Sequence, residues 1–186
     1  MKRLAALLAL FLLPHSHLRA ELFTSKEFGF TANLSGEQAG PIRMDTALGP
    51  MVVFMSADQK TQMIYQISFF HTKEHEKLGK LDEQMQKRLL ETHLEGQKLI
   101  PDIVDMKSSW MEGTTRPVME ITNRQVVPPE DGGGNLYSRK YVFMRGPTYI
   151  SLSVAGTANN EALKLAARKF LDSFEMTGEA KLLPHK

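Results

Sequence analysis

The 186-residue chain contains no cysteine and a single tryptophan, and it carries no large excess of either charge. The missing thiols exclude disulfide scaffolds, thiolate zinc sites, iron–sulfur clusters, cysteine nucleophiles and lipid attachment through an N-terminal cysteine. What is present is a globular composition, with 42% hydrophobic and 24% charged residues. That composition also excludes wholesale disorder and collagen-like repetition.

The chain also lacks an apolar run long enough to span a bilayer, which takes about 20 residues. Its longest run covers ten residues, Leu4 to Leu13, which follow two basic residues and end at Pro14. Ala20 then supplies a small residue for cleavage, and the whole pattern is typical of a secretory signal peptide. We therefore expect residues 1–20 to be removed and the mature protein to be soluble, periplasmic or secreted, without membrane insertion.

The formal net charge of +2 depends on this first segment. Residues 1–20 hold three of the 23 basic residues and none of the 21 acidic ones, so their removal leaves 20 against 21 and a net charge of −1. A nucleic-acid partner would require a basic excess or stripe, so we expect no binding to nucleic acid. The remaining 166 residues suit one domain, which we place at 21–175, followed by a flexible tail at 176–186.

Apolar residues alternate with polar ones in most of the mature chain, which predicts β-strands. Gly49-Pro50 is expected to be a turn between two of them. The predicted strands cover 28–34, 42–48, 51–55, 63–69, 103–112, 115–126, 136–145 and 149–155.

Two segments show helical spacing of apolar residues instead. One begins near Leu78 and should end at Gly96; the other follows a cap at Asn159 or Asn160 and buries a stripe from Leu163 to Phe174. Consecutive strands joined by short turns pair antiparallel. The order ββββ-α-ββββ-α therefore predicts an α+β fold with a central antiparallel sheet flanked by helices.

The segment from His71 to His75 spells H-x-x-E-H, the pattern of one class of metalloprotease. The chemistry would use His71 and His75 as zinc ligands and Glu74 to activate a bound water. Because the segment joins a strand to a helix and is highly charged, we interpret it as a solvated connector and keep metal-dependent hydrolysis as an alternative. His93 is expected to face water from the charged flank of its helix.

Other catalytic patterns are weaker still. There is no G-x-S-x-G serine elbow. Glu112, Glu120 and Asp131 are interpreted as surface carboxylates, since nothing in the sequence brings two of them together. The run Gly132–Gly134 is interpreted as a hairpin loop and the 11 methionines as core filling.

Four residues are candidates for contact with a partner, because aromatic residues and arginine are enriched at interfaces. Trp110 should share a strand face with Val104, Met106 and Ser108. The other three candidates alternate along one strand together with Tyr141 and Phe143, and they are Tyr137, Arg139 and Arg145. The preferred interpretation is that Tyr141 and Phe143 belong to the core, with the arginines at its rim.

The two ends of the mature chain resemble the PsbP-like and DcrB-like proteins. The resemblance rests on Phe23–Phe30, which ends in Gly29-Phe30, and on the closing segment Ala166–Phe174, which ends in a Ser-Phe pair. Ser35 stands where the pattern has proline, and the cysteine that carries lipid in the bacterial lipoproteins is missing. The nuclear Ran-binding relatives share the fold, but the signal segment argues against that role.

The resemblance implies a non-enzymatic accessory or protein-binding module, with no catalytic residues and no cofactor. We therefore expect another envelope or extracellular protein as partner. Besides the hydrolase, the sequence leaves open a carrier of a small apolar ligand held between sheet and helix.

Overall fold

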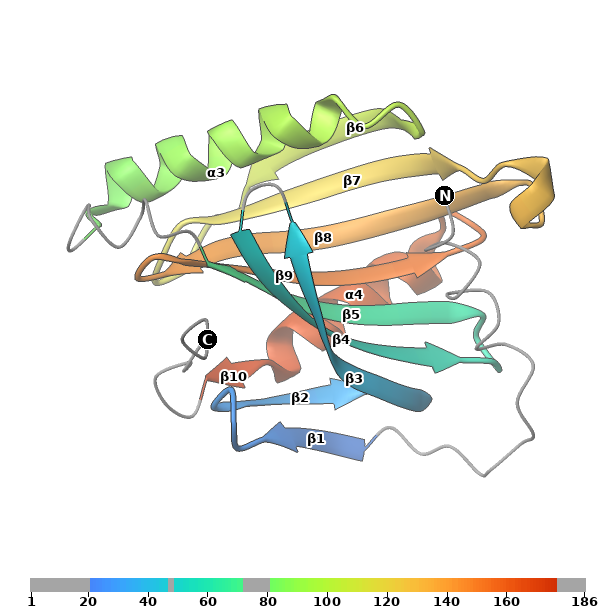
Figure 1. Cartoon of the computed structure of the whole chain (residues 1–186), viewed down its shortest axis with the longest axis horizontal. Helices are drawn as coiled ribbons and strands as arrows, with labels where there is room; N and C mark the ends of the chain where they lie inside the picture. Colours follow the sequence, from blue (N-terminus) through green and yellow to red (C-terminus); the bar gives the residue numbers. More distant parts are fainter. Residues whose placement is uncertain (1–20, 47–48, 72–80, 177–186) are drawn as a thin grey trace.

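The computed structural model describes residues 21–46, 49–71 and 81–176 of the chain. Two antiparallel sheets and two α-helices make up this part (Figure 1). The strands are β1 Glu21–Ser25, β2 Phe30–Leu34, β3 Glu37–Thr46, β4 Gly49–Asp58, β5 Met63–His71, β6 Ile103–Trp110, β7 Val118–Val126, β8 Asn135–Arg145, β9 Thr148–Gly156 and β10 Glu175–Met176. The helices are α3 Glu83–Lys98, α4 Glu161–Ser173 and the short 3-10 helix η2 Pro129–Asp131.

Seven strands form the large sheet in the order β3-β4-β5-β9-β8-β7-β6. Every neighbouring pair is antiparallel, and the central pair β5–β9 joins segments from the two halves of the chain, with Ile67 opposite Leu152. The predicted α+β class, with an antiparallel sheet flanked by helices, is therefore confirmed. No helix in the part of the chain that the structure describes is long and apolar enough to cross a membrane.

The two helices lie on opposite faces of the large sheet, because alternate residues of β8 contact them. Tyr141 and Phe143 pack in the core on the α4 side, whereas Val142 and Met144 pack against α3. The interpretation of Tyr141 and Phe143 as core residues is confirmed by their exposed fractions of 3% and 5%.

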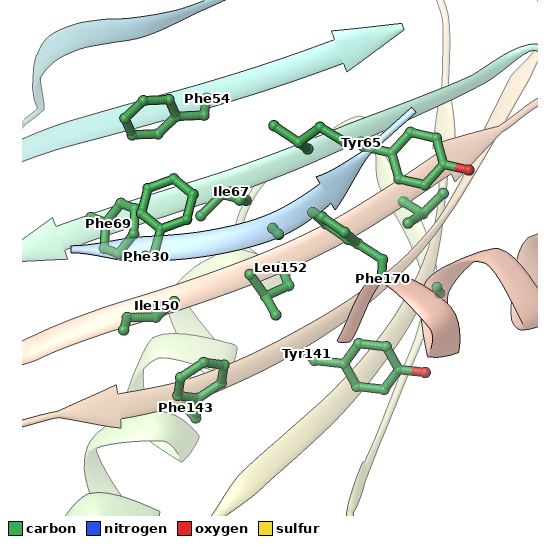
Figure 2. Close-up of a cluster of buried hydrophobic side chains, with 14 of the residues drawn as sticks. Phe30, Phe54, Tyr65, Ile67, Phe69, Tyr141, Phe143, Ile150, Leu152 and Phe170 are labelled. Carbon is green, nitrogen blue, oxygen red and sulfur yellow. The ribbon is translucent and has the colours of Figure 1, made fainter. Parts of the chain in front are cut away.

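The α4 face holds the main core, which is rich in aromatic side chains (Figure 2). Phe30 of β2 packs edge-on against Phe54 with ring centroids 5.1 Å apart. The Phe69 ring lies on the same side of the sheet, with its centroid 5.3 Å from that of Phe30. Leu163, Ala167 and Phe170 of α4 close this layer, as the apolar stripe predicts. A small sheet of β1, β2 and β10 extends the layer beside α4.

Several predicted boundaries were wrong. β1 and β10 were not predicted, since the one lacks a clean alternation and the other has two residues. Met176, placed in the tail, pairs with Phe30 of β2, and residues 177–186 lie outside the described part. The first predicted strand begins at Phe30, after a turn in which Gly29 has φ of 61°.

The predicted turn at Gly49-Pro50 is part of β4, where Gly49 pairs with Thr46 and Pro50 with Asp45. Gly49 has φ of 134°, and an added Cβ would lie 2.8 Å from the carbonyl oxygen of His71. The predicted turn is therefore displaced, since β3 and β4 connect between Thr46 and Gly49, and Gly49 itself allows close packing against β5.

Both helices begin at side-chain caps. Asp82 accepts a bond from the Met85 backbone N–H at 2.7 Å, and Asn160 accepts one from Leu163 at 3.0 Å, which confirms the predicted Asn160 cap. Gly96 does not end α3, which continues to Lys98. The helix stops before Pro101.

Candidate functional site

The structure describes one residue of the H-x-x-E-H segment. His71 is the last residue of β5, and its Nδ1 lies 3.2 Å from the hydroxyl of Thr148. Glu74 and His75 lie outside the described residues. Within the ranges that are described, no group of three or more His, Asp or Glu side chains could hold a metal ion. The metal-dependent hydrolase therefore stays an untested prediction.

The four candidate partner residues do not form one surface. Tyr137, Arg139 and Arg145 occupy the α4 face of β8, and the first and last lie eight residues apart, about 27 Å along an extended strand. Trp110 is opposite Met119 in the β6–β7 ladder and therefore lies on the α3 face. The sheet itself separates Trp110 from the other three.

The residues on β8 are largely engaged within the chain. Tyr137 packs against the main core. Arg139 forms an ion pair with Glu120 in which both side chains are mostly covered, so Glu120 is not the free surface carboxylate that the sequence suggested. Arg145 has a buried Nη1 without a hydrogen-bond partner among the described residues.

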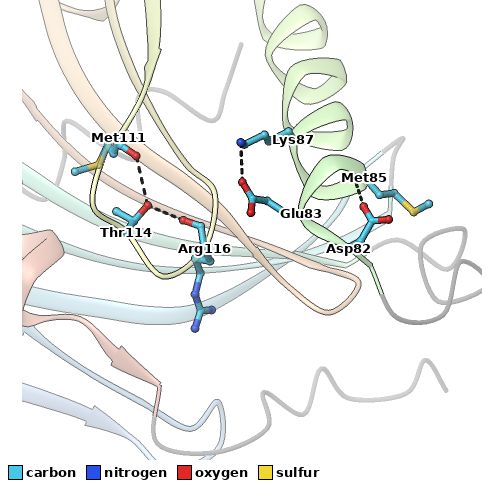
Figure 3. Close-up of polar contacts among 7 residues, drawn as sticks. All are labelled: Asp82, Glu83, Met85, Lys87, Met111, Thr114 and Arg116. Carbon is cyan, nitrogen blue, oxygen red and sulfur yellow. Dashed lines mark hydrogen bonds and ion pairs between the residues drawn. The ribbon is translucent and has the colours of Figure 1, made fainter.

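Trp110 lies at the end of the outermost strand, β6, with 36% of its surface exposed. The Lys87 ammonium of α3 lies 5.8 Å from the centroid of its ring, within the range of a cation–π contact. Lys87 also forms an ion pair of 2.7 Å with Glu83 (Figure 3). The indole is thus held beside the first turns of α3 and remains partly open to solvent.

The β6–β7 hairpin that follows Trp110 is braced by Thr114 (Figure 3). Its hydroxyl lies 2.7 Å from the Arg116 carbonyl oxygen and 3.4 Å from that of Met111. The Met111 N–H donates to the Val118 carbonyl at 2.9 Å. These contacts extend the regular pairing of β6 one residue beyond the strand.

The predicted face shared by Val104 and Trp110 is wrong, because β6 contains a bulge. The register shifts between Val104 and Lys107, and Asp105 has a positive φ of 53°. An extra residue in a strand moves all later side chains to the other face. Lys107–Trp110 then pair regularly with β7 up to Met119.

A polar cluster lies farther along α3, between this helix and the sheet. Gln97 connects two basic side chains: its Nε2 lies 2.7 Å from Nε2 of His93, and its Oε1 lies 3.5 Å from Nζ of Lys140 on β8. Next to Lys140 on the same face, Ser138 donates to the Asn123 side-chain oxygen at 2.7 Å. This cluster was missed from sequence, because its members come from α3, β7 and β8.

His93 does not face water as predicted. Its ring stacks on Tyr149 of β9, with centroids 5.1 Å apart, and the Tyr149 hydroxyl donates to the Leu89 carbonyl of the same helix at 3.0 Å. Burial, reinforced by the charge of Lys140, lowers the pKa of His93 to about 4. Burial also raises the pKa of Tyr149 to about 12. Both rings are therefore neutral near pH 7.

Comparisons with known proteins identify no family for the chain. No protein-family model matches it, and no similar sequence is found among the curated proteins. Three solved structures share the general arrangement of strands and helices at low identity.

A Bacteroides thetaiotaomicron protein is 16% identical with a TM-score of 0.47 over 87% of this chain, which spans 50% of that protein. The cyanobacterial PsbP of Synechocystis is 11% identical with a TM-score of 0.44, over 84% of this chain and 91% of its own. A Pseudomonas aeruginosa protein of unknown function, PA94, is 14% identical with a TM-score of 0.46, over 92% of this chain and 99% of its own. One of the three is thus a PsbP protein, the group that the chain ends resemble, and these distant likenesses carry no functional argument.

Proposed function

We propose that this chain is a binding module that acts outside the cytoplasm and takes up a short extended segment of a partner protein along β6. One observation carries the proposal: the outer half of β6 is a regular, exposed sheet edge that ends in the only tryptophan of the chain. The module would act by binding, and no step of catalysis is assigned to it.

The backbone of this edge offers hydrogen bonds outward. In an antiparallel pair, alternate residues direct their N–H and C=O groups to the neighbouring strand. The Met111 N–H donates to the Val118 carbonyl of β7. Ser109 and Lys107 lie two and four residues before Met111, so their backbone N–H and C=O groups also point toward β7. Ser108 and Trp110 therefore direct their backbone groups away from the sheet, where a partner strand could pair with them.

The opposite edge of the same sheet is blunted. β3 has an irregular register between Ala39 and Ile42, and Pro41 within it lacks an N–H. The bulge at Asp105 similarly makes the first half of β6 too irregular to pair with a partner strand. Four residues, Lys107–Trp110, remain as the regular edge, which suits a short segment anchored by an apolar side chain against the exposed indole.

The proposal that the module acts outside the cytoplasm rests on residues 1–20. Their charged start, apolar run and small cleavage residue are typical of a secretory signal. N-terminal sequencing of the protein recovered from an envelope extract should begin near Glu21. Recovery of the intact chain from the cytoplasm would contradict export and leave the β6 proposal unaffected.

The edge can be blocked by one substitution. Ser108→Pro removes an outward N–H while leaving the bonds to β7 in place, and Ser108→Ala is the matched control that keeps the N–H. Trp110→Ala removes the anchor. Cross-linking of the purified protein to an envelope fraction, read by quantitative mass spectrometry, should recover a partner with the wild type and Ser108→Ala.

The same partner should be lost with Ser108→Pro and with Trp110→Ala, while both variants unfold cooperatively as the wild type does. A partner retained by both variants would place the interface elsewhere. If no partner is recovered with the wild type, the binding role itself is refuted.

A further inference from the structure

Lys140 is a basic residue in an unusual setting. It lies in β8 on the face that α3 covers, with Ser153 on one neighbouring strand and Ile121 on the other. Among the residues that the structure describes, it forms no ion pair, and its one polar contact is the 3.5 Å approach to Gln97. The side chain is surrounded by many protein atoms, yet part of its surface remains accessible to solvent.

The hydrogen bonds around Lys140 have a single consistent direction. A lysine ammonium only donates, so it takes the Gln97 carbonyl oxygen, and the Gln97 amide then donates to the His93 ring. That ring nitrogen must be unprotonated to accept. A neutral His93 agrees with its depressed pKa, which the burial of the ring and the nearby Lys140 charge both produce. The remaining Lys140 protons have no acceptor among the described residues.

A second donor lies nearby on β7. Asn123 is 7% exposed, and its oxygen accepts from Ser138, but its Nδ2 is buried and has no hydrogen-bond partner among the described residues. Asn123 is opposite Ser138, and Lys140 follows two residues later on the same face. Diagonal neighbours of this kind have Cα atoms about 7–8 Å apart, so the two side chains lie on one face within reach of a common group.

We propose that Lys140 and Asn123 form a binding site for an oxyanion, the carboxylate or phosphate group of a small ligand, between α3 and the large sheet. Among the described residues, the Asn123 amide N–H has no acceptor and Lys140 has no counter-ion, and both lack the same partner, an anionic oxygen. The site is separate from the β6 edge and does not depend on the function proposed there.

The charge of Lys140 decides how the site responds to pH. The titratable groups that face Lys140 are His93 from α3 and, behind it, Tyr149 from β9, and both are neutral near pH 7. Burial lowers the pKa of Lys140, whereas a bound anion raises it again. The bound anion therefore favours the ammonium form of Lys140, and binding should be lost at a pH high enough to remove that proton.

Isothermal titration of the mature protein with inorganic phosphate and with succinate tests the proposal. The wild type should bind at least one of the two, and the ion that binds identifies phosphate or carboxylate as the chemistry. Lys140→Met should weaken that binding at least tenfold, because methionine keeps most of the unbranched chain and removes the charge. Lys98→Met, which removes an exposed lysine of α3, should leave it unchanged.

The proposal is overturned if neither ion binds the wild type, or if Lys140→Met binds as well as the wild type. Should Lys140→Met fail to fold, the Asn123 resonance of the wild type still decides the question. The side-chain amide resonance of Asn123 should shift and saturate during the titration, and an unmoved resonance refutes the site.

Discussion

The two faces of the large sheet carry different side chains, although the same strands supply both. Toward α4, the strands bury an aromatic layer that includes Phe30, Phe54 and Phe69. Toward α3, the buried cluster is smaller, and Lys140, His93 and Gln97 lie beside it. One face can thus supply most of the stability, while the other tolerates polar groups whose burial costs stability.

The largest expected effect is on the α4 face. Phe69 is 0% exposed and contacts the rings of Phe28, Phe30 and Phe54. Phe69→Ala should lower the free energy of unfolding by about 3–5 kcal/mol, since it removes a buried ring and leaves a cavity. Chemical denaturation monitored by circular dichroism measures the change. A loss below about 1 kcal/mol would show that this face does not dominate stability.

Leu90 is the matching position on the α3 face, where it is 1% exposed. Leu90→Ala should cost about 2–3 kcal/mol, because the smaller cluster around it can collapse more easily. The same denaturation experiment gives the value. A cost greater than that of Phe69→Ala would reverse the order of the two faces.

Acid should destabilise the protein through the α3 face. His93 has a folded pKa of about 4, below its ordinary value of 6.5, so the unfolded chain binds more protons between these values. The free energy of unfolding should therefore fall as the pH drops from 6.5 to 4, by about 1–3 kcal/mol from this residue, and level off below. Denaturation at several pH values measures the slope.

His93→Phe is the control, since it keeps a ring against Tyr149 and removes the titration. The variant should lose the part of the acid sensitivity that falls between pH 6.5 and about 4. An unchanged pH profile would mean that His93 does not titrate in this interval.

The smallest expected effects are at the two helix caps, and they should be equal in size. Asp82→Ala and Asn160→Ala each remove one side-chain bond to a backbone N–H, from α3 and α4 respectively. Each should cost about 1 kcal/mol. Hydrogen exchange should show the loss confined to the first turn of the altered helix, and protection lost throughout the sheet would contradict a local capping role.

Elements with a regular hydrophobic period could be predicted from sequence. β9 has the alternation of a strand, and α4 has the apolar stripe of a helix. Prediction from the local sequence failed where the conformation of a residue depends on the strand that pairs with it. The bulge at Asp105 and the strand position of Gly49 depend on β7 and on the β5 backbone respectively. Neither neighbour can be identified from the local sequence.

The candidate sites also combine features that the sequence could predict with features that depend on distant contacts. Trp110 could be selected by residue type, but its position on the α3 face follows from the bulge before it. The contact of His93 with Gln97 joins residues one helical turn apart, and its extension to Lys140 crosses 43 positions. A histidine on a charged flank gives no sign that a tyrosine of β9 will cover it.

What the sequence determined by itself was the α+β class, because hydrophobic periodicity is a local property that each element carries alone. The composition likewise excluded thiol chemistry, since a chain without cysteine has no thiol in any conformation. Only the tertiary structure decided which edge of the sheet stays regular and which polar residues meet under α3. Both depend on pairing between distant strands, and the free energy of that pairing is a property of the assembled sheet and not of any one segment.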